Sequence, residues 1–564
     1  MTFAFSRHGL RGRDAVLQRA FEILPGAISW TILLGMLALS FVKPLLAAVL
    51  VIAIFFYWLV RLLYMTLFLV LSYARLSIEA KTSWMERVQG LDDLAGYLPA
   101  LRQAPPEGWA ARVSWWLHGR QLDTLQRGGA PWPSSASVHH VVILPVAKEQ
   151  PEVLLPGLQS LAAQSFPARR ILVVLAVEER GGEAIRQGAE ALRERFAGAF
   201  LDCLVIVHPD GLPGEARVKG ANATYAARAA HRAMTARGLA PEQAIVSCFD
   251  ADTVVSQEYM ACLTYHFLTS PERTQASFQP IPVYHNNIWE VPGFARVLET
   301  GSSFFQLIEA TNPEQLVTFS SHSMSFKALV DVGYWPVDMI SDDSSIFWKA
   351  FLHFDGRYQV VPMYVTLSMD VVSARSWLRT VRNVYRQKRR WAWGVENFPL
   401  VMRAFLTARQ IPRWHRIRHA AKLLEAHVGW ATWGFLLTVL GWFPALFAGR
   451  EFSSSVLYYS APRITATIFH LASLSLLISI VLSQLLLPPQ RVRFKALRRI
   501  GLALEWLLVP FSATFLSALP ALDAQTRLML GRYMEFWVTE KGHRPRSRAV
   551  QGTPSLVNEH GGLR

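Results

Sequence analysis

Apolar segments at both ends of the chain are the feature that most constrains its fold. Residues 24–42 and 44 to about 73 are almost entirely apolar, and each is long enough to cross a bilayer. Apolar stretches return at 428–448, 465–487 and 500–522. A cleaved signal peptide would end after one short apolar core, whereas here a second apolar segment follows at once. The sequence therefore predicts one large water-soluble domain between two membrane regions.

The basic residues lie at the flanks of these segments. The formal net charge is +16, an excess that either nucleic acid or anionic lipid together with anionic substrates would explain. The mean hydropathy of +0.22 indicates that much of the chain is not water-soluble. Four arginines precede the first segment, three basic residues follow the second, and only Lys43 lies between them. This placement disfavours a nucleic-acid-binding protein. The positive-inside rule predicts that the N-terminus and the residues after 75 are cytoplasmic, which indicates a plasma (inner) membrane protein with a cytoplasmic domain.

The last apolar stretch decides the side of the C-terminus. It contains Pro510 and Pro520, and a single crossing would place the basic tail outside, against the charge rule. A re-entrant hairpin would keep the tail in the cytoplasm. The predicted organisation is a transmembrane hairpin at 1–75, a connector at 76–137, a catalytic domain at 138–408, an interfacial amphipathic helix at 409–427, a C-terminal transmembrane region at 428–522 and a cytoplasmic tail at 523–564.

Between the membrane regions, short apolar runs alternate with helical patterns. Strands are expected at 139–147, 170–177, 202–208 and 244–250, with helices at 152–165, 182–197 and 219–237. The alternation predicts an α/β domain with a parallel sheet that helices cover on both faces. The cysteines have no metal-ligand spacing and are expected to be reduced packing residues; they are Cys203, Cys248 and Cys262.

Two short acidic motifs are the first candidates for chemistry. Asp250 and Asp252, in "FDADT", follow the fourth strand, and ligands bind beyond the carboxyl ends of parallel strands. Two carboxylates there can hold Mg²⁺ or Mn²⁺ against a diphosphate, although such a pair also caps helices. Asp342 and Asp343, in "ISDDSSIFWKA", either cap a helix together with Ser341 or supply a general base in a cleft.

A third motif lies at 385–394, "YRQKRRWAWG", where Gln387, Arg390 and Trp391 match Q-x-x-R-W. The order FDADT, SDD and QKRRW resembles membrane-integrated family 2 glycosyltransferases such as cellulose, hyaluronan and chitin synthases. Those enzymes carry D-x-D, T-E-D-like and Q-x-x-R-W motifs in this order. "FWVTEK" (536–541) matches F-x-V-T-x-K, the gating-loop motif of bacterial cellulose synthase. The resemblance covers about 139–541 and implies a GT-A type domain inserted between N- and C-terminal transmembrane helices.

The resemblance also implies a role for each matching residue. Asp343 is implied as the catalytic base on the acceptor hydroxyl, and Asp250 and Asp252 as ligands of Mg²⁺ or Mn²⁺. The residues implied on the nucleotide-sugar side are Lys219 (in "VKGANA"), Asp250, Arg390, Thr539 and Lys541. Those implied on the acceptor side are Gln387, Trp391, Asp342 and His322.

Three stretches depart from the family pattern. The second strand ends in "LAVEER", so either Glu178 or Glu179 stands in for the usual aspartate, and the second acidic motif is Ser-Asp-Asp. "FSSHSMSF" (319–326) lacks the usual glycine, and its His322 either touches the acceptor or is structural. The basic residues of "YRQKRRWAWG" without an implied role are expected to contact solvent or lipid headgroups; they are Arg386, Lys388 and Arg389.

The predicted function is inverting transfer of a sugar from a nucleotide-sugar donor, with a UDP-sugar favoured, to a growing polysaccharide. Export of the product, with partner subunits, is an extension of this prediction. The alternative within enzymes is transfer of one sugar to a lipid or lipid-linked acceptor. The alternative from another class is a membrane transporter with a cytosolic regulatory domain, which the scarcity of ionisable residues within the spans disfavours. No nucleic-acid partner is expected.

Overall fold

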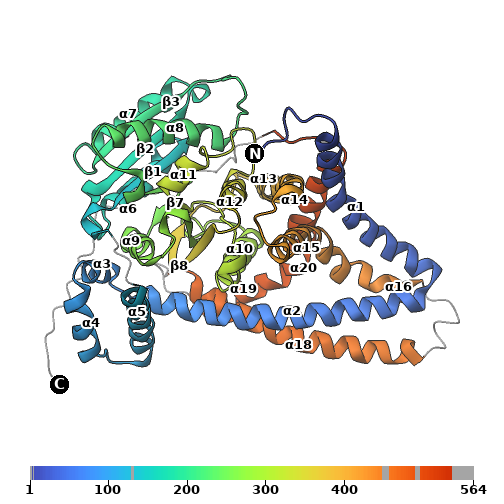
Figure 1. Ribbon diagram of the computed structural model, residues 1–564. Helices are drawn as coiled ribbons and strands as arrows, with labels where there is room; N and C mark the ends of the chain where they lie inside the picture. The colour runs from blue at the N-terminus through green and yellow to red at the C-terminus, as the bar shows by residue number, and fades with distance from the viewer. Residues whose placement is uncertain (1–2, 4, 129–132, 448–455, 489–495, 536–564) are drawn as a thin grey trace.

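The structure is a computed structural model that describes residues 3, 5–128, 133–447, 456–488 and 496–535 (Figure 1). The water-soluble domain lies to one side, and long apolar helices extend away from it as an arm. The helices that follow the second apolar segment, between residues 84 and 128, lie beside the near end of that arm (Figure 1).

The described residues form a mixed sheet of eight strands in the order β3-β2-β1-β4-β7-β6-β8-β5. The strands are β1 (His139–Val146), β2 (Ile171–Glu178), β3 (Asp202–His208), β4 (Ala244–Cys248), β5 (Val254–Val255), β6 (Ala276–Val283), β7 (Ser323–Ser325) and β8 (Gln359–Ser368). The four strands predicted from the alternation, β1 to β4, are parallel to one another. This half of the sheet confirms the α/β prediction.

The other half of the sheet differs from the parallel arrangement that the sequence predicted. The short strand β7 runs antiparallel to both β4 and β6, and β5 runs antiparallel to β8. Only β6 and β8 are parallel there. The sheet is therefore mixed. The strands of its second half do not belong to the regular alternation of strand and helix that makes the first half parallel.

Helices cover both faces of the sheet, as predicted. Val142 and Leu144 point to the face covered by α6 (Pro151–Ala162), α7 (Glu183–Arg195) and α9 (Tyr259–Thr269). Val141 and Ile143 point to the opposite face, under α8 (Lys219–Thr235), α11 (Phe326–Asp331) and α12 (Asp342–His353). Successive strand residues face opposite sides, so an unbroken apolar strand such as β1 fills two cores at once. This double burial explains why the first strands lack polar alternation.

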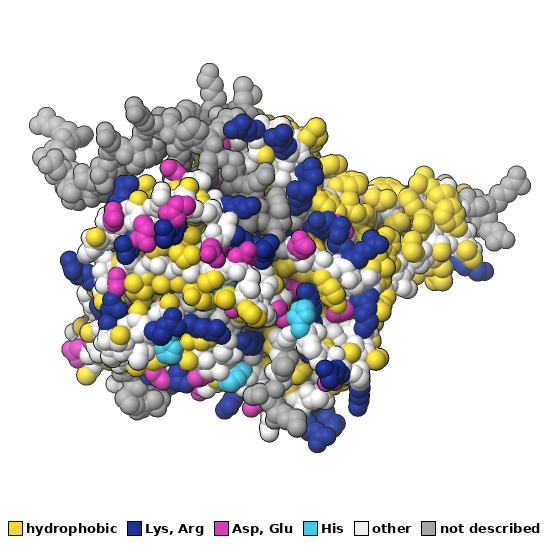
Figure 2. All heavy atoms as spheres, turned by 90° about the horizontal axis from the view of Figure 1, so that it is seen from above, with side chains coloured by type: hydrophobic (Ala, Val, Ile, Leu, Met, Phe, Trp, Pro, Cys, Tyr) yellow, Lys and Arg dark blue, Asp and Glu magenta, His cyan; other side chains and the backbone are white. Residues whose placement is uncertain are grey.

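Four helices among the described residues are long and apolar enough to cross a membrane, which makes the chain a membrane protein. They are α1 (Arg13–Val42), α2 (Pro44–Glu79), the segment Arg463–Leu486 of α18 (Val456–Leu486), and the segment Ile500–Met529. Figure 2 shows apolar side chains gathered on the arm, with Lys and Arg bordering it. The arm includes both segments of the predicted N-terminal hairpin.

Two parts of the C-terminal region differ from a set of straight spans. The expected interfacial helix at 409–427 is continuous with the residues that follow, in α15 (Arg413–Thr438). The chain then bends by 47° into Leu440–Leu446. The segment Ile500–Met529 is divided into short pieces: α19 (Ala496–Leu504), η9 (Glu505–Leu508), α20 (Val509–Ala513), the π-helical turn η10 (Thr514–Ala518) and α21 (Leu519–Met529). The re-entrant hairpin expected for the last apolar stretch, 500–522, stays a prediction.

The predicted connector is largely helical. It contains α3 (Trp84–Asp92), α4 (Leu94–Gln103) and α5 (Trp109–Gly128). Three further helices join the soluble domain to the membrane region: α10 (Gly293–Glu309), α13 (Trp377–Ala392) and α14 (Asn397–Thr407). The cysteines Cys203, Cys248 and Cys262 are free and buried, in agreement with the sequence.

Candidate active site

A cavity of about 210 Å³ opens where the parallel strands end. Its walls come from the carboxyl ends of β1 and β2, from the residues after β4, from the first turns of α8 and α12 and from the last turns of α13. Ligands of α/β sheets bind at this edge. The sequence-predicted residues that line the cavity are Glu178, Lys219, Asp250, Asp252, Asp342, Asp343, Gln387, Arg390 and Trp391. All three motifs therefore meet in one place.

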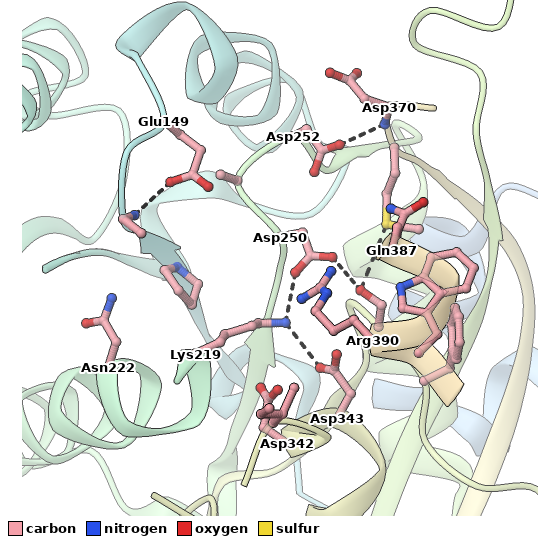
Figure 3. A pocket seen from close by; sticks show the side chains of 18 of the residues that line it. Glu149, Lys219, Asn222, Asp250, Asp252, Asp342, Asp343, Asp370, Gln387 and Arg390 are labelled. Carbon is pink, nitrogen blue, oxygen red and sulfur yellow. Dashed lines mark hydrogen bonds and ion pairs between the residues drawn. The ribbon is translucent and has the colours of Figure 1, made fainter. Parts of the chain in front are cut away.

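The centre of the cavity is a lysine between two carboxylates (Figure 3). The Lys219 ammonium donates to Asp250 Oδ1 at 2.8 Å and to Asp343 Oδ1 at 3.1 Å. The Lys219 side chain is only 10% exposed. Burial by itself would lower the pKa of Lys219, but the carboxylates of Asp250 and Asp343 outweigh that effect and raise it well above its ordinary value. Lys219 is therefore a fixed cation that brings the first two acidic motifs together.

A strained turn holds Asp250 from the other side. Ser320 donates its hydroxyl to Asp250 Oδ2, and the Asp250 backbone N–H donates to Ser321 Oγ at 3.1 Å. Ser321 has a φ of 59°, in the left-handed region that non-glycine residues seldom adopt. Such strain persists where the surroundings impose it, and it clusters at functional sites. "FSSHSMSF" therefore contributes to the site through its serines, in the stretch where the family's glycine is missing.

Asp252 lies deeper than Asp250. It is 3% exposed, and its Oδ2 accepts the backbone N–H of Asp370 at 2.8 Å. No cluster of three His, Cys, Asp or Glu side chains suited to a metal occurs among the described residues. Mg²⁺ and Mn²⁺, however, are commonly held by one or two carboxylates together with substrate phosphates. Two carboxylates on one cavity wall fit an ion whose coordination a diphosphate would complete.

Asp342 and Asp343 open α12, and they do not act as the helix cap. Ser341 is the residue before the helix, and its hydroxyl donates to Glu396 Oε1 at 2.8 Å rather than capping the helix. Burial and the neighbouring Asp343 raise the pKa of Asp342 to about 8, while Lys219 acts in the opposite direction. The raised pKa favours the protonated form of Asp342, and Asp343, with a 26% exposed side chain, faces the cavity.

The last turns of α13 supply the third wall. Gln387, Arg390 and Trp391 line the cavity because their spacing of three and four residues places them on one side of the helix. The Trp391 ring packs edge-on against Phe319, with centroids 5.7 Å apart, and lies 6.3 Å from the ring of Tyr284. Trp391 is thus set in an aromatic wall at one end of the cavity.

The basic residues of QKRRW do not simply face solvent, which corrects the sequence-based expectation. Lys388 is 2% exposed, and its ammonium donates to Glu299 Oε2 at 2.9 Å and to Ser302 Oγ at 2.9 Å. The same ammonium lies 3.8 Å from the centroid of the Trp391 ring. Arg389 pairs with Asp523 at 2.8 Å. The buried Glu299 of α10 and the half-buried Asp523 of α21 hold these basic side chains, and the sequence of α13 alone does not reveal those partners.

Four predicted residues lie away from the cavity wall or outside the described chain. Glu179 accepts the backbone N–H of Asp210 at 2.9 Å, and among the two glutamates Glu178 is the one that lines the cavity. His322 is buried behind the wall, where its Nδ1 lies 3.1 Å from the carbonyl oxygen of Phe319. This favours the structural interpretation of His322. Thr539 and Lys541 lie outside the described residues.

Several residues that line the cavity are not part of the three sequence motifs. Glu149 accepts the backbone N–H groups of Ala147 and Lys148 at 2.7 and 2.9 Å and so fixes the loop after β1. Asn222, one turn after Lys219, donates to the carbonyl of Ala176 at 2.7 Å. Asn222 lies within "VKGANA", the stretch of Lys219 that resembles the family, so a signal was present for it, and Glu149 closely follows the first predicted strand at 139–147. Asp370 and Tyr284 carried no comparable signal.

The sequence is similar to known glycosyltransferases in the part of the chain that carries these motifs. Residues 245–482 match the model of glycosyl transferase family group 2. Poly-beta-1,6-N-acetyl-D-glucosamine synthase of Staphylococcus aureus (strain COL) is 28% identical over 179 residues, which cover 30% of this chain and 39% of the relative. The Staphylococcus epidermidis protein of the same name is 28% identical over 159 residues, 26% of this chain and 34% of the relative. The chain thus spans about two fifths of the length of these relatives or less.

Two solved structures are also similar at low identity. The mannosyltransferase PcManGT from Pyrobaculum calidifontis, in complex with GDP-Man and Mn²⁺, has a TM-score of 0.36 and 17% identity, covering 75% of this chain and 99% of that one. TarS residues 1–349 of S. aureus, in complex with UDP-GlcNAc, has a TM-score of 0.34 and 13% identity, covering 71% and 94%.

The fold and the site define a domain of the α/β class with a cavity at the carboxyl ends of its parallel strands. The family match covers residues 245–482, less than half of the chain, and the three motifs resemble those of family 2 glycosyltransferases, in a chain that also carries membrane helices.

The buried pair beneath Trp391 can be tested by stability. Lys388→Met would leave the Glu299 carboxylate buried without its cation, which costs about 3–5 kcal/mol of unfolding free energy. We expect the double variant Lys388→Met/Glu299→Gln to recover much of that loss, because it removes the uncompensated charge. Thermal unfolding in detergent measures both effects.

Lys327→Met is the matched control for Lys388→Met. Lys327 pairs with Asp331 four residues along at the protein surface, where such a pair contributes about 0.5 kcal/mol or less. Equal losses in Lys388→Met and Lys327→Met would show that Lys388 carries no special structural role.

Proposed function

We propose that the protein is a membrane-embedded inverting glycosyltransferase that extends a polysaccharide from a nucleotide-sugar donor, with a UDP-sugar favoured. One observation supports this most strongly: a single cavity is lined by the D-x-D aspartates, Asp343 and the Q-x-x-R-W residues. The names of the curated relatives support a polymeric product built from N-acetylglucosamine. The polymer itself, its linkage and its export belong to the proposal.

Asp343 is the proposed base. Its carboxylate takes the proton of the acceptor hydroxyl as the hydroxyl oxygen forms a bond to the anomeric carbon of the donor. The bond from that carbon to the diphosphate oxygen breaks, and its electron pair leaves with the diphosphate. A single displacement of this kind inverts the anomeric centre. Asp343 suits the task because it faces the cavity at the first turn of a rigid helix.

The leaving diphosphate gains negative charge, and the cavity offers cations to balance it. Arg390 lines the wall, and Lys219 lies between the donor-side Asp250 and the acceptor-side Asp343. Asp250 and Asp252 would hold Mg²⁺ or Mn²⁺, which neutralises developing charge on the diphosphate when bound. Glu178 and Asn222, at the β2 side of the cavity, are proposed to face the nucleotide.

The aromatic end of the cavity is proposed to receive the acceptor. Trp391 offers a flat face for a sugar ring, Gln387 lies one turn before it on α13, and Asp342, next to Asp343, adds a hydrogen-bonding group to the cavity wall. In the protonated form that its raised pKa favours, Asp342 can donate a hydrogen bond to an acceptor oxygen without adding charge next to Asp343. The soluble domain is proposed to lie on the cytoplasmic side of the plasma (inner) membrane, where nucleotide sugars are present.

Release of nucleoside diphosphate by the detergent-purified chain tests the proposal. The panel comprises UDP-N-acetylglucosamine, UDP-glucose and GDP-mannose, each with Mg²⁺ or Mn²⁺. We expect release with a UDP-sugar and its loss on addition of EDTA. Asp343→Asn should lower the rate by at least about 10²-fold, the lower range for loss of a positioned base.

Asp331→Asn is the matched control, because Asp331 undergoes the same chemical change at the surface of α11. Release that survives Asp343→Asn would remove Asp343 as the base. The size of the labelled product then separates a polymer from a single sugar on a lipid acceptor.

The pH profile tests the protonated state of Asp342. Above about pH 8 the Asp342 carboxyl ionises, which places a second negative charge beside Asp343 and the anionic donor. We therefore expect kcat/KM to fall as the pH rises through about 8. In Asp342→Asn, which stays neutral, this fall should be absent. An unchanged alkaline fall in Asp342→Asn would assign it to another group.

A further inference from the structure

The helix α5, in the segment between the second membrane helix and the sheet, has one strongly apolar exposed face. Trp109 is 72% exposed, Trp116 50%, Leu117 39% and Val113 38%. Their spacing of three, four and seven residues places them along one side of the helix. Single exposed apolar side chains are ordinary, whereas a continuous stripe with two tryptophans indicates a binding surface.

Arginines border this stripe. Arg112, Arg120 and Arg127 are exposed on α5, and the Arg120 guanidinium lies 4.9 Å from the centroid of the Trp116 ring. The single acidic residue in the sequence of α5, Asp123, is paired with Arg102 of α4. The exposed face therefore combines tryptophan, aliphatic and positively charged side chains, as in helices that lie in the interface of an anionic membrane.

The opposite side of α5 is fixed to the protein, so the stripe cannot turn inward. Trp115 Nε1 donates to the carbonyl of Leu101 at 2.7 Å, and His118 Nδ1 lies 2.7 Å from the hydroxyl oxygen of Tyr265. Leu122 is fully buried in the core beside α9. These contacts hold α5 against α4 and α9 and leave the tryptophan stripe as its outer surface.

The position of α5 identifies the surface that this stripe meets. The helix lies beside the end of α2 where the chain leaves the membrane segment (Figure 1), and the Arg87 guanidinium just beyond α2 donates to Ser114 Oγ at 2.7 Å. Leu67 and Leu71 of α2 are still 56% and 53% exposed. The helix α2 continues for about 12 Å from Leu71 to its end at Glu79. When the helix is tilted, this distance brings the end of α2 close to the depth of the lipid headgroups.

We propose that α5 lies in the headgroup layer of the membrane leaflet next to the soluble domain, with Trp109 and Trp116 at the interface and its arginines on anionic lipid. The positive charge of the stripe and its continuity with the lipid-exposed end of α2 favour a bilayer over a protein partner. This contact fixes the soluble domain at the membrane surface independently of the transmembrane arm.

A fluorescent label on α5 tests the proposal in the full chain. Val113→Cys keeps both tryptophans and all the arginines, and the three native cysteines are buried, so a thiol-reactive bimane marks position 113 under native conditions. The chain is reconstituted in vesicles of phosphatidylcholine with or without phosphatidylglycerol, containing lipid with a quencher near the headgroup. We expect quenching and a blue shift at 113 when phosphatidylglycerol is present.

Two comparisons decide the outcome. Arg193→Cys places the same label on exposed α7, which covers the sheet, and should not be quenched. Removing Arg112 and Arg120 together, as Arg112→Gln/Arg120→Gln in the Val113→Cys chain, should shift the docking equilibrium away from lipid by about fivefold per charge. Quenching at 113 no stronger than at 193 would overturn the proposal, as would quenching that the two arginine substitutions leave unchanged.

Discussion

The ammonium group of Lys219 lies between the carboxylates of Asp250 and Asp343, and the arrangement of the site depends on this contact. Asp250 follows a strand and Asp343 lies in the first turn of a helix, so without a cation between them their charges would repel each other in the cavity. Lys219 comes from a third element, the first position of α8, which packs on the sheet. One buried lysine thus joins the proposed donor and acceptor halves of the cavity.

A second set of buried charges connects this cavity to the membrane region. Lys388 pairs with Glu299 of α10, beneath Trp391. One turn earlier on α10, Arg296 donates to Glu505 of η9, in the last apolar segment. The two ion pairs make α10 a rigid link between the aromatic wall of the cavity and the membrane helices. The acceptor end of the site is therefore positioned by elements that belong to both parts of the chain.

The sequence predicted the parts of the fold that local patterns determine. The strands β1 to β4 and the helices between them follow from apolar runs alternating with amphipathic stretches, and their parallel order places Asp250 at the correct edge. The rest depends on pairing between distant segments: β5 has two residues and β7 three, too few for a pattern. Lys388 looked like a surface residue because its partner Glu299 is 89 residues away. The choice between Glu178 and Glu179 likewise needed the backbone geometry at the end of β2.

Calorimetric titration of UDP, with and without Mg²⁺, tests most directly whether the carboxylates around Lys219 have separate donor and acceptor roles. The titration uses three forms of the full chain: unchanged, Asp252→Asn and Asp343→Asn. We predict that Asp252→Asn loses the Mg²⁺-dependent part of the affinity. Asp343→Asn should bind UDP at least as tightly as the unchanged chain, because it removes a negative charge and leaves the donor side intact. Loss of UDP binding in Asp343→Asn, or undiminished Mg²⁺ dependence in Asp252→Asn, would contradict separate donor and acceptor carboxylates in this cavity.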